Sequence, residues 1–278
     1  MNISVMIFTL NEEMHLPLCL DSLQWCDDII VIDSFSIDQT EAVARRAGAR
    51  FFQNRFAGFG SQRNWAFSNV ETRHPWVLVL DADEKVTPEL ATELQQAVET
   101  VAEDVAAFRL CRRFYMWGKW LKYSSLYPTW VVRLVRPDRV RYVDRGHAET
   151  QHVEGRIVSL RHDLVDENLR GIDAWFERQN RYSRADAEYE YRNIPSGNPL
   201  ASIISADPLQ RRAGIKRIAS VLPFRGLWFF LYCYLIRRGF LDGREGFVFC
   251  SMKAMHQRMI AIKKYDISKR ENTGVVGR

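Results

Sequence analysis

A nine-residue segment, 76–84, combines an apolar run with acidic residues that could hold a divalent metal ion. Its sequence is Trp-Val-Leu-Val-Leu-Asp-Ala-Asp-Glu. The five apolar residues are typical of a buried strand in a parallel sheet. Side chains two residues apart on an extended segment point the same way, so we expect Asp81 and Asp83 to present their carboxylates together. Such a pair suits a hard cation that also binds phosphates. The alternative is an ordinary polar loop after a strand.

Two other predicted strands also end in polar residues. Residues 3–8 are apolar and lead to Thr9 and Asn11, and residues 29–32 lead to Asp33. The carboxyl ends of parallel strands share one edge of a sheet, where ligands bind in open α/β folds. We therefore expect these polar groups to converge on one site. No GxGxxG follows the first strand and no GxxxxGK[ST] occurs, which disfavours dinucleotide dehydrogenases and P-loop NTPases.

The segments between these strands predict helices. We expect helices from Pro17 to near Trp25, from Ser36 to Ala47, over 61–69, and from Thr87-Pro88 onward, with a further strand at 50–53. Ser36 and Gln39 have the spacing of a capping box, and Gly48 suits the end of that helix. The alternation predicts an α/β fold with a Rossmann-like, mostly parallel sheet.

The pattern changes after residue 105. Segments 106–110 and 130–135 predict strands, and 171–191 predicts a helix that precedes a break at 194–199. An aromatic-rich loop joins the two strands, with Phe114, Tyr115, Trp117, Trp120, Tyr123 and Tyr127. Such a loop could stack on a sugar ring or could pack into the core, and both interpretations stay open.

The net charge of +5 conceals a basic C-terminal region. Between 209 and 264 there are twelve Lys or Arg and two acidic residues, a net charge of +10, which leaves −5 for the rest. This region contains ten consecutive apolar residues, 227–236, flanked by Arg225, Arg237 and Arg238. A bilayer span needs about twenty residues. We predict peripheral docking on an anionic membrane, with a buried core helix as the alternative. No nucleic-acid-binding motif accompanies the charge.

Cysteine usage and the first residues suggest a compartment. Five scattered cysteines without a CxxC pair argue against a disulfide framework or a zinc site. Residues 1–5 look like a strand rather than a signal peptide. We expect a cytoplasmic protein at the inner face of the cytoplasmic membrane. The expected organisation is a catalytic domain at 1–192, a basic, aromatic-rich helical region at 193–267, and a flexible tail at 268–278.

Several segments resemble, in order and spacing, the blocks of family 2 glycosyltransferases of the GT-A fold. They are Thr9-Leu10-Asn11-Glu12-Glu13, residues 31–40, Phe59-Gly60-Ser61-Gln62-Arg63-Asn64, Asp81-Ala82-Asp83-Glu84 and Gly146-His147-Ala148-Glu149. The third and the last resemble a bacterial branch that includes lipopolysaccharide-core glucosyltransferases of the WaaE/KdtX type. Ala148 stands where that branch often has His. The resemblance extends through 238–243 and covers nearly the whole chain.

The resemblance implies a nucleotide-sugar donor, with a UDP-sugar expected. Asp33 would accept a hydrogen bond from the base, and Thr9 and Glu12 would line the base and ribose. Asp83 would bind Mg²⁺ or Mn²⁺ that bridges the diphosphate, with Asp81 on the ribose, a metal-bound water or the metal. The ion would neutralise the leaving nucleoside diphosphate. The other donor-binding positions that it implies are Asn11, Ser34, Gln62 and Arg63.

Two roles in the implied site have competing candidates. Arg63 could add positive charge near the phosphates or could form a surface salt bridge. The acceptor hydroxyl needs a general base within hydrogen-bond reach. Glu149 is our choice because it lies in the matching block; Asp144 is the alternative, and His147 is a weaker candidate. A single displacement at the anomeric carbon would invert its configuration.

The sequence therefore predicts a metal-dependent, inverting glycosyltransferase. Its expected acceptor is a lipid-linked or lipopolysaccharide-type glycan. One rival is a nucleotidyltransferase of similar fold, which would need a basic pyrophosphate-binding loop where 9–13 is acidic. Another rival is a catalytically silent, membrane-associated scaffold, which would not need Asp33, Asp81, Asp83 and Glu149 together.

Overall fold

The computed structural model describes residues 2–193 and 223–272. Contacts divide the chain into two compact units, which we describe separately. Unit 1 comprises Met1–Lys122, Leu126–Asp144 and Ala148–Leu169, and unit 2 comprises Tyr123–Ser125, Arg145–His147 and Arg170–Arg278. The break expected at 194–199 and the start of the basic region, up to residue 222, lie outside the described residues.

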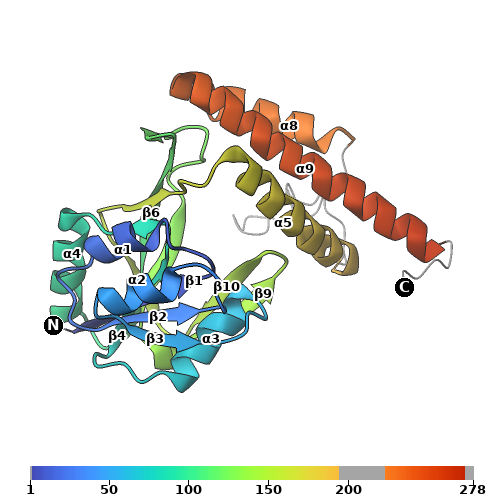
Figure 1. The fold of residues 1–278 in the computed structure, drawn as a ribbon. Coiled ribbons are helices and arrows are strands. Elements are labelled where there is room, and N and C mark those ends of the chain that lie inside the picture. The colour runs from blue at the N-terminus through green and yellow to red at the C-terminus, as the bar shows by residue number, and fades with distance from the viewer. Residues whose placement is uncertain (1, 194–222, 273–278) are drawn as a thin grey trace. The chain divides into compact units, whose positions relative to one another are not determined.

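A large, mostly parallel sheet forms the framework of unit 1 (Figure 1). Its strands are β1 (Ile3–Thr9), β2 (Ile29–Asp33), β3 (Arg50–Gln53), β4 (Trp76–Asp81), β5 (Glu84–Lys85), β6 (Val105–Met116), β7 (Lys119–Trp120), β8 (Trp130–Val135), β11 (Arg156–Ser159) and β12 (Leu164–Glu167). The order is β3-β2-β1-β4-β8-β6-β12-β5, with β7 and β11 paired to β6. β3, β2, β1 and β4 are parallel, whereas β8 is antiparallel to β4 and β6. The α/β prediction is confirmed.

The register of the parallel strands aligns their polar ends. Thr9 lies opposite Asp33, and Phe8 lies opposite Asp81. The expected convergence at the carboxyl edge of β2, β1 and β4 is therefore confirmed. A separate hairpin of β9 (Val140–Arg145) and β10 (Ala148–Val153) follows β8 and the short 3₁₀ turn η1 (Pro137–Arg139).

Helices cover both faces of the sheet because alternate strand residues point to opposite sides. α1 (Leu16–Asp21), α2 (Thr40–Arg46) and α4 (Pro88–Glu99) pack on one face, with Leu16, Ala44, Leu90 and Leu94 in its buried cluster. α3 (Phe59–Asn69) packs on the other, with Ala66 beside Met6 and Ile32. α4 begins at Thr87-Pro88 as expected, and the Thr87 side chain caps it by accepting from the Leu90 N–H.

Three local expectations were wrong. The helix expected at Ser36 begins at Thr40, because the Ser36 hydroxyl bonds Asp33 Oδ1 at 2.5 Å instead of capping a helix. α1 ends at Asp21 rather than near Trp25. β4 ends at Asp81, and Asp83 lies in the turn before β5, so the two carboxylates are not alternate residues of one strand.

From Arg170 onward, the described residues of unit 2 are mostly helical. They form α5 (Ile172–Arg192), α8 (Arg225–Leu231), the π-helical turn η2 (Tyr232–Ile236), the 3₁₀ turn η3 (Gly239–Asp242) and α9 (Gly243–Asn272). α9 packs along both α5 and α8 (Figure 1). The polar segment expected to be a flexible tail is helical as far as Asn272. Among the described residues, no helix is long and apolar enough to cross a bilayer.

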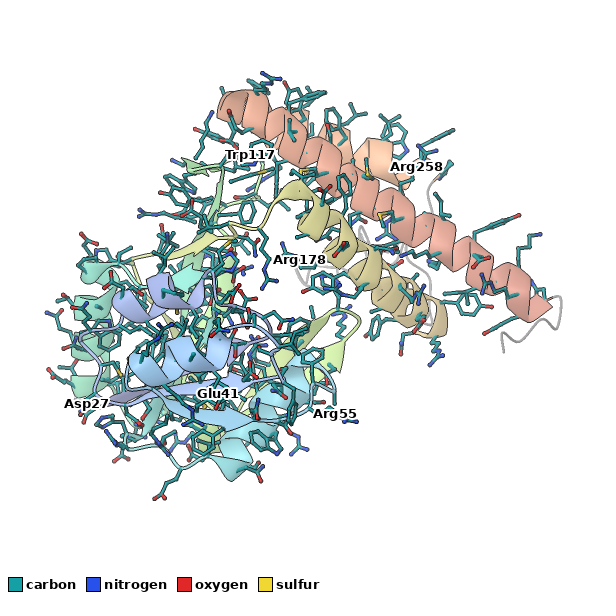
Figure 2. All side chains as sticks on the ribbon, in the orientation of Figure 1. Asp27, Glu41, Arg55, Trp117, Arg178 and Arg258 are labelled. Carbon is teal, nitrogen blue, oxygen red and sulfur yellow. The ribbon has the colours of Figure 1, made fainter. Side chains whose placement is uncertain are left out.

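The expected aromatic loop is only partly a loop. Phe114 and Tyr115 belong to β6, which pairs with β7 through Tyr115 and Trp120. Trp120 meets Tyr127 edge to face, with ring centroids 5.3 Å apart. Trp117 lies at the β6–β7 turn and is 60% exposed (Figure 2). Both packing and an exposed ring therefore occur in this segment.

Candidate active site

Arg63 is the central residue of the site at the carboxyl edge of unit 1. It projects from α3 and is only 3% exposed. One guanidinium nitrogen, Nη2, donates to Asp81 Oδ1 at 3.0 Å, and Nη1 forms an ion pair with Glu149 Oε1 at 2.5 Å. The rings of Phe8 and Tyr142 lie 5.4 and 5.5 Å from the guanidinium carbon. The alternative of a surface salt bridge was therefore wrong, because the Arg63 side chain is buried.

A second arginine completes the network around Asp81. Arg133 Nη2 donates to Asp81 Oδ2 at 2.6 Å and to Glu84 Oε1 at 2.5 Å. Burial raises the pKa of Asp81, but the charges of Arg133 and Arg63 outweigh it and hold the pKa well below its usual range. Burial lowers the pKa of Arg133, but the negative charges of Asp81 and Glu84 raise it by more. The pKa of Arg133 therefore lies well above its usual value. Asp81 and Arg133 therefore stay ionised, whereas burial raises the pKa of Glu84 above its usual value.

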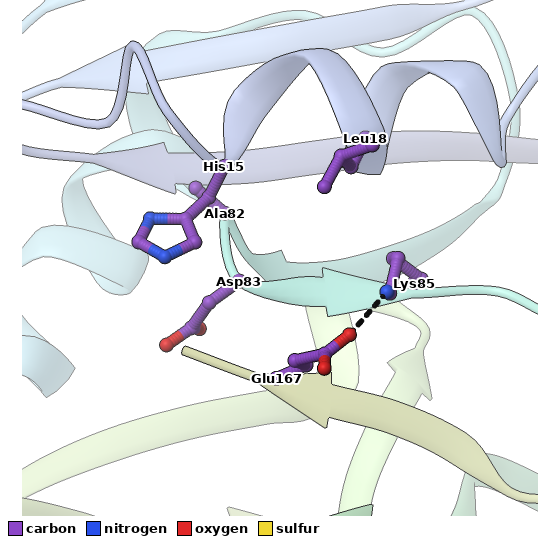
Figure 3. A pocket seen from close by; sticks show the side chains of 6 residues that line it. All are labelled: His15, Leu18, Ala82, Asp83, Lys85 and Glu167. Atoms are coloured by element: carbon purple, nitrogen blue, oxygen red, sulfur yellow. Dashed lines mark hydrogen bonds and ion pairs between the residues drawn. The ribbon is translucent and has the colours of Figure 1, made fainter. Parts of the chain in front are cut away.

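Asp83 lies beside this network and lines a small pocket. Figure 3 shows it with His15, Leu18, Ala82, Lys85 and Glu167 around the same space. Asp83 Oδ2 accepts a hydrogen bond from the Asn168 amide at 2.9 Å, and Lys85 pairs with Glu167 at 2.8 Å. Burial, followed by the negative charge of Asp83, raises the pKa of Asp166 to about 8. The Asp166 carboxyl is therefore mostly protonated at pH 7, beside the carboxylate of Asp83.

The described residues hold no ready-made metal cage. No group of three or more His, Cys, Asp or Glu side chains in residues 2–193 and 223–272 is arranged to hold a metal ion. Both oxygens of Asp81 face arginines, and His15 uses both of its ring nitrogens, with Glu12 Oε2 and the Leu169 N–H. Asp83 is therefore the better placed of the two predicted ligands, and a metal ion there would need further oxygens from a ligand.

Asp33 is fully buried, and its carboxylate organises the loop after β2. Thr9 Oγ1 donates to Oδ1 at 2.9 Å, and the Ser36 hydroxyl donates to the same oxygen. Oδ2 accepts from the Ser36 N–H at 2.8 Å and, more weakly, from the Gln53 amide at 3.3 Å. A carboxylate has about four acceptor positions, and these bonds fill them.

The other predicted donor-site residues join neighbouring loops. Asn11 Oδ1 accepts from the Ile37 N–H at 2.9 Å, and Glu12 Oε2 pairs with His15 Nδ1 at 2.7 Å. Gln62 is buried, and its amide donates to Ser34 Oγ at 3.3 Å. These bonds tie the loop after β1 to the loop after β2 and to α3.

The two alternative bases have other partners. Asp144 accepts from the Gly60 N–H at 2.6 Å, the Ser61 N–H at 3.2 Å and the Ser61 hydroxyl at 2.5 Å, so it caps the first turn of α3. In unit 2, His147 Nδ1 lies 2.7 Å from Asp186 Oδ2. Both residues therefore have positioning contacts, whereas Glu149 joins the Arg63 network.

No role was predicted from the sequence for Arg133, Glu84 or Asn168. Arg133 had a readable signal, because it interrupts the apolar strand β8 and charged side chains are rarely buried without a partner. Glu84 belongs to the Asp81–Glu84 motif, yet its partner is 49 residues away. Nothing near Asn168 in the sequence indicated its bond to Asp83.

Comparison with known families decides the class of this protein. The Glycosyl transferase family 2 model matches residues 4–167, more than half of the chain, and this range includes Arg63, Asp81, Asp83 and Glu149. The chain belongs to glycosyl transferase family 2. It is a glycosyltransferase, and the rival assignments as a nucleotidyltransferase or a silent scaffold are set aside.

Individual relatives of this glycosyltransferase agree with the family. The lipopolysaccharide core biosynthesis glycosyltransferase LpsC of Rhizobium meliloti is 28% identical over 209 residues, 69% of this chain and 74% of LpsC. An uncharacterised glycosyltransferase of Rickettsia felis is 24% identical over 99% of this chain and 93% of its own length. Among solved structures, the mannosyltransferase PcManGT of Pyrobaculum calidifontis, in complex with GDP-Man and Mn²⁺, has a TM-score of 0.52 at 15% identity, over 95% and 87% of the two chains. This likeness supports the GT-A fold.

Proposed function

We propose that this protein is a metal-dependent, inverting glycosyltransferase that moves a sugar from a nucleotide-sugar donor to a lipopolysaccharide-type or lipid-linked glycan. The observation that supports this most directly is the chain of contacts Asp81–Arg63–Glu149. These contacts join the carboxyl edge of the sheet, where we propose that the donor nucleotide binds, to the Glu149 carboxylate proposed as general base. The name of the relative LpsC supports the acceptor class.

Donor binding is proposed at the carboxyl edge of β1, β2 and β4. Asp33 would accept a base N–H in place of Gln53, whose 3.3 Å bond is the longest of those that Asp33 accepts. Thr9 holds the Asp33 carboxylate in place for that exchange. UDP-sugars and GDP-sugars both carry such an N–H, so either nucleotide fits this contact.

The chemistry of the residues around Asp83 fits Mg²⁺ or Mn²⁺. Asp83 supplies a hard oxygen ligand that the Asn168 amide orients. Magnesium sites commonly use one or two carboxylates and complete their shell with substrate phosphates. When bound, the ion would neutralise charge on the departing nucleoside diphosphate.

Glu149 is the proposed general base. Its Oε1 atom is held by Arg63, and its side chain keeps partial exposure, at 15%. A base must reach the proton of the acceptor hydroxyl before its pKa matters. Asp144 suits this role less because its oxygens accept three bonds from Gly60 and Ser61. Attack by the activated hydroxyl opposite the leaving diphosphate would invert the anomeric carbon.

The decisive experiment is a donor screen. Purified protein would be incubated with UDP- and GDP-sugars and Mn²⁺, and release of the nucleoside diphosphate would be measured with and without chelator. Hydrolysis or transfer that depends on the metal is expected. Glu149→Gln should lower the transfer rate by roughly 10²–10⁴-fold while donor affinity stays near that of the wild type. Full activity in excess chelator would contradict the metal role, and a fully active Glu149→Gln would contradict the base.

We further propose that unit 2 docks this enzyme on an anionic membrane at the inner face of the cytoplasmic membrane. The proposed division is a catalytic domain at 1–192 and a membrane-associated region at 193–267. The core-helix alternative is disfavoured for 227–236, because Trp228 is 52% and Ile236 is 72% exposed. Further exposed apolar side chains in this part of unit 2 are Phe224, Leu227, Tyr232, Leu235, Phe240, Leu241 and Phe247. Aromatic residues beside basic ones favour the membrane interface.

Sedimentation with liposomes tests this docking. Binding should require anionic lipid, weaken with salt, and fall when Trp228 and Ile236 become Ser or when the exposed Arg238 becomes Glu. Arg55→Glu is the matched control, because it makes the same charge change at an exposed position of unit 1 (Figure 2). Equal losses from Arg238→Glu and Arg55→Glu would indicate a general charge effect and contradict a docking surface.

A further inference from the structure

Phe35 has a backbone conformation that phenylalanine rarely adopts. Its φ is +62°, in the left-handed region where a bulky side chain is strained and glycine is not. Such strain persists when surrounding structure enforces it, and it is concentrated at functional sites. Packing gives little compensation here, because the Phe35 side chain is 55% exposed. The fold itself therefore gains little from an aromatic ring at this position.

The loop holds Phe35 on both sides. The Ser34 N–H donates to the Thr9 carbonyl at 2.9 Å, and the Ser36 N–H and hydroxyl both bond Asp33. The Asn11 N–H adds a bond to Ser36 Oγ at 2.7 Å. An exposed ring is thus carried on an anchored backbone, two residues after the carboxylate proposed to meet the base.

We propose that the Phe35 ring is the surface on which the base of the donor nucleotide stacks. This inference rests on the proposed function. A base has two faces suited to aromatic stacking, and stacking tolerates either a pyrimidine or a purine. The Asp33 carboxylate would read the hydrogen-bonding edge of the same base. Phe35 then supplies affinity, and Asp33 supplies selectivity for a base that carries an N–H.

Calorimetric binding of UDP and of GDP with Mn²⁺ tests the proposal. Phe35→Leu keeps an apolar side chain but removes the ring, so affinity should fall about 5- to 30-fold for the nucleotide that the wild type binds. Phe35→Trp should retain or improve affinity. Ile37→Ala is the matched control, because Ile37 lies in the same loop, is apolar and is 93% exposed. Its affinity should match that of the wild type.

Phe35→Gly separates the binding role from loop damage. Glycine relieves the strain, so the thermal midpoint should stay equal or rise by a few degrees while nucleotide affinity still falls. Unchanged affinity in Phe35→Leu, or equal losses in Phe35→Leu and Ile37→Ala, would overturn the proposal. If the wild-type protein binds neither nucleotide, the proposed function is overturned as well. If the wild type binds a nucleotide and Phe35→Leu binds it equally well, the stacking role alone is overturned.

Discussion

Replacing Arg63 with methionine removes a guanidinium that contacts both Asp81 and Glu149. Methionine keeps an apolar stem but lacks the guanidinium, so the main loss is electrostatic. Removing one partner of a buried ion pair typically costs 3–5 kcal/mol, because a charge is left buried and unpaired. Asp81 keeps Arg133, and its side chain is 36% exposed, so we expect the lower end, about 3 kcal/mol.

That loss should appear as a lower thermal midpoint. For domains of this size, 1 kcal/mol corresponds to roughly 2–4 °C, so the shift at pH 7 should be about 6–12 °C. The difference in thermal midpoint between the wild type and Arg63→Met should become smaller at acidic pH. The pKa of Asp81 in the folded protein lies below 3.8, so its contribution is present above that pH and is lost as the pH falls further. Calorimetry of both proteins from pH 7 to pH 2 measures this convergence, which we expect only below about pH 3.8.

Two controls make the Arg63 prediction specific. Glu149→Gln should cost less stability than Arg63→Met, because Arg63 still pairs with Asp81. The double variant should be less destabilised than the sum of the two single variants, because the residues share a contact. Arg63→Lys should be intermediate, since an ammonium keeps the charge but lacks the planar fork. A wild-type midpoint for Arg63→Met at pH 7 would refute a stabilising role for these ion pairs.

Three further predictions concern other parts of the chain. Asp83→Asn should lower transfer by roughly 10²–10³-fold with an unchanged thermal midpoint, and an Mn²⁺ titration that shows undiminished activity would contradict the metal role. Asp144→Ala should cost about 1 kcal/mol of stability through loss of the α3 cap, with transfer near the wild-type rate; a stable but inactive variant would instead favour Asp144 as the base. In unit 2, burial lowers the pKa of His256 below 6.5, so its contribution to stability is present above that pH and is lost as pH falls. Burial raises the pKa of Asp186, but hydrogen bonds from histidines lower it more, so its contribution is lost only at still lower pH. The thermal midpoint of unit 2 should therefore fall between pH 7 and pH 5, and His256→Asn should flatten that slope.

The strands and several helix boundaries were readable from the sequence, because their causes are local. Apolar runs defined β1, β2 and β4 to within one residue, and β3 matched its predicted bounds. Thr87-Pro88 correctly marked the start of α4. Ser36 misled the prediction, because its hydroxyl donates to Asp33 Oδ1, three residues earlier, and its oxygen accepts from the Asn11 N–H, 25 residues earlier, instead of from a helix N–H. A local capping motif does not specify which N–H donor reaches the Ser36 oxygen.

The polar ends of three strands were also predictable as one site, because a parallel sheet places them on one edge. The segments that resemble family 2 glycosyltransferases predicted which ligand this site would bind, a nucleotide sugar. The contacts of each charged group were decided only in the tertiary structure: Arg63 bonds Asp81 18 residues away, Arg133 bonds Asp81 52 residues away, and Asp144 caps a helix 84 residues earlier. A buried charge is stable only with partners within a few ångströms, and sequence spacing says nothing of such distances. Residue types therefore determined the chemistry available to this protein, and the tertiary arrangement of α3, β8 and β10 decided which carboxylates pair with Arg63 and Arg133.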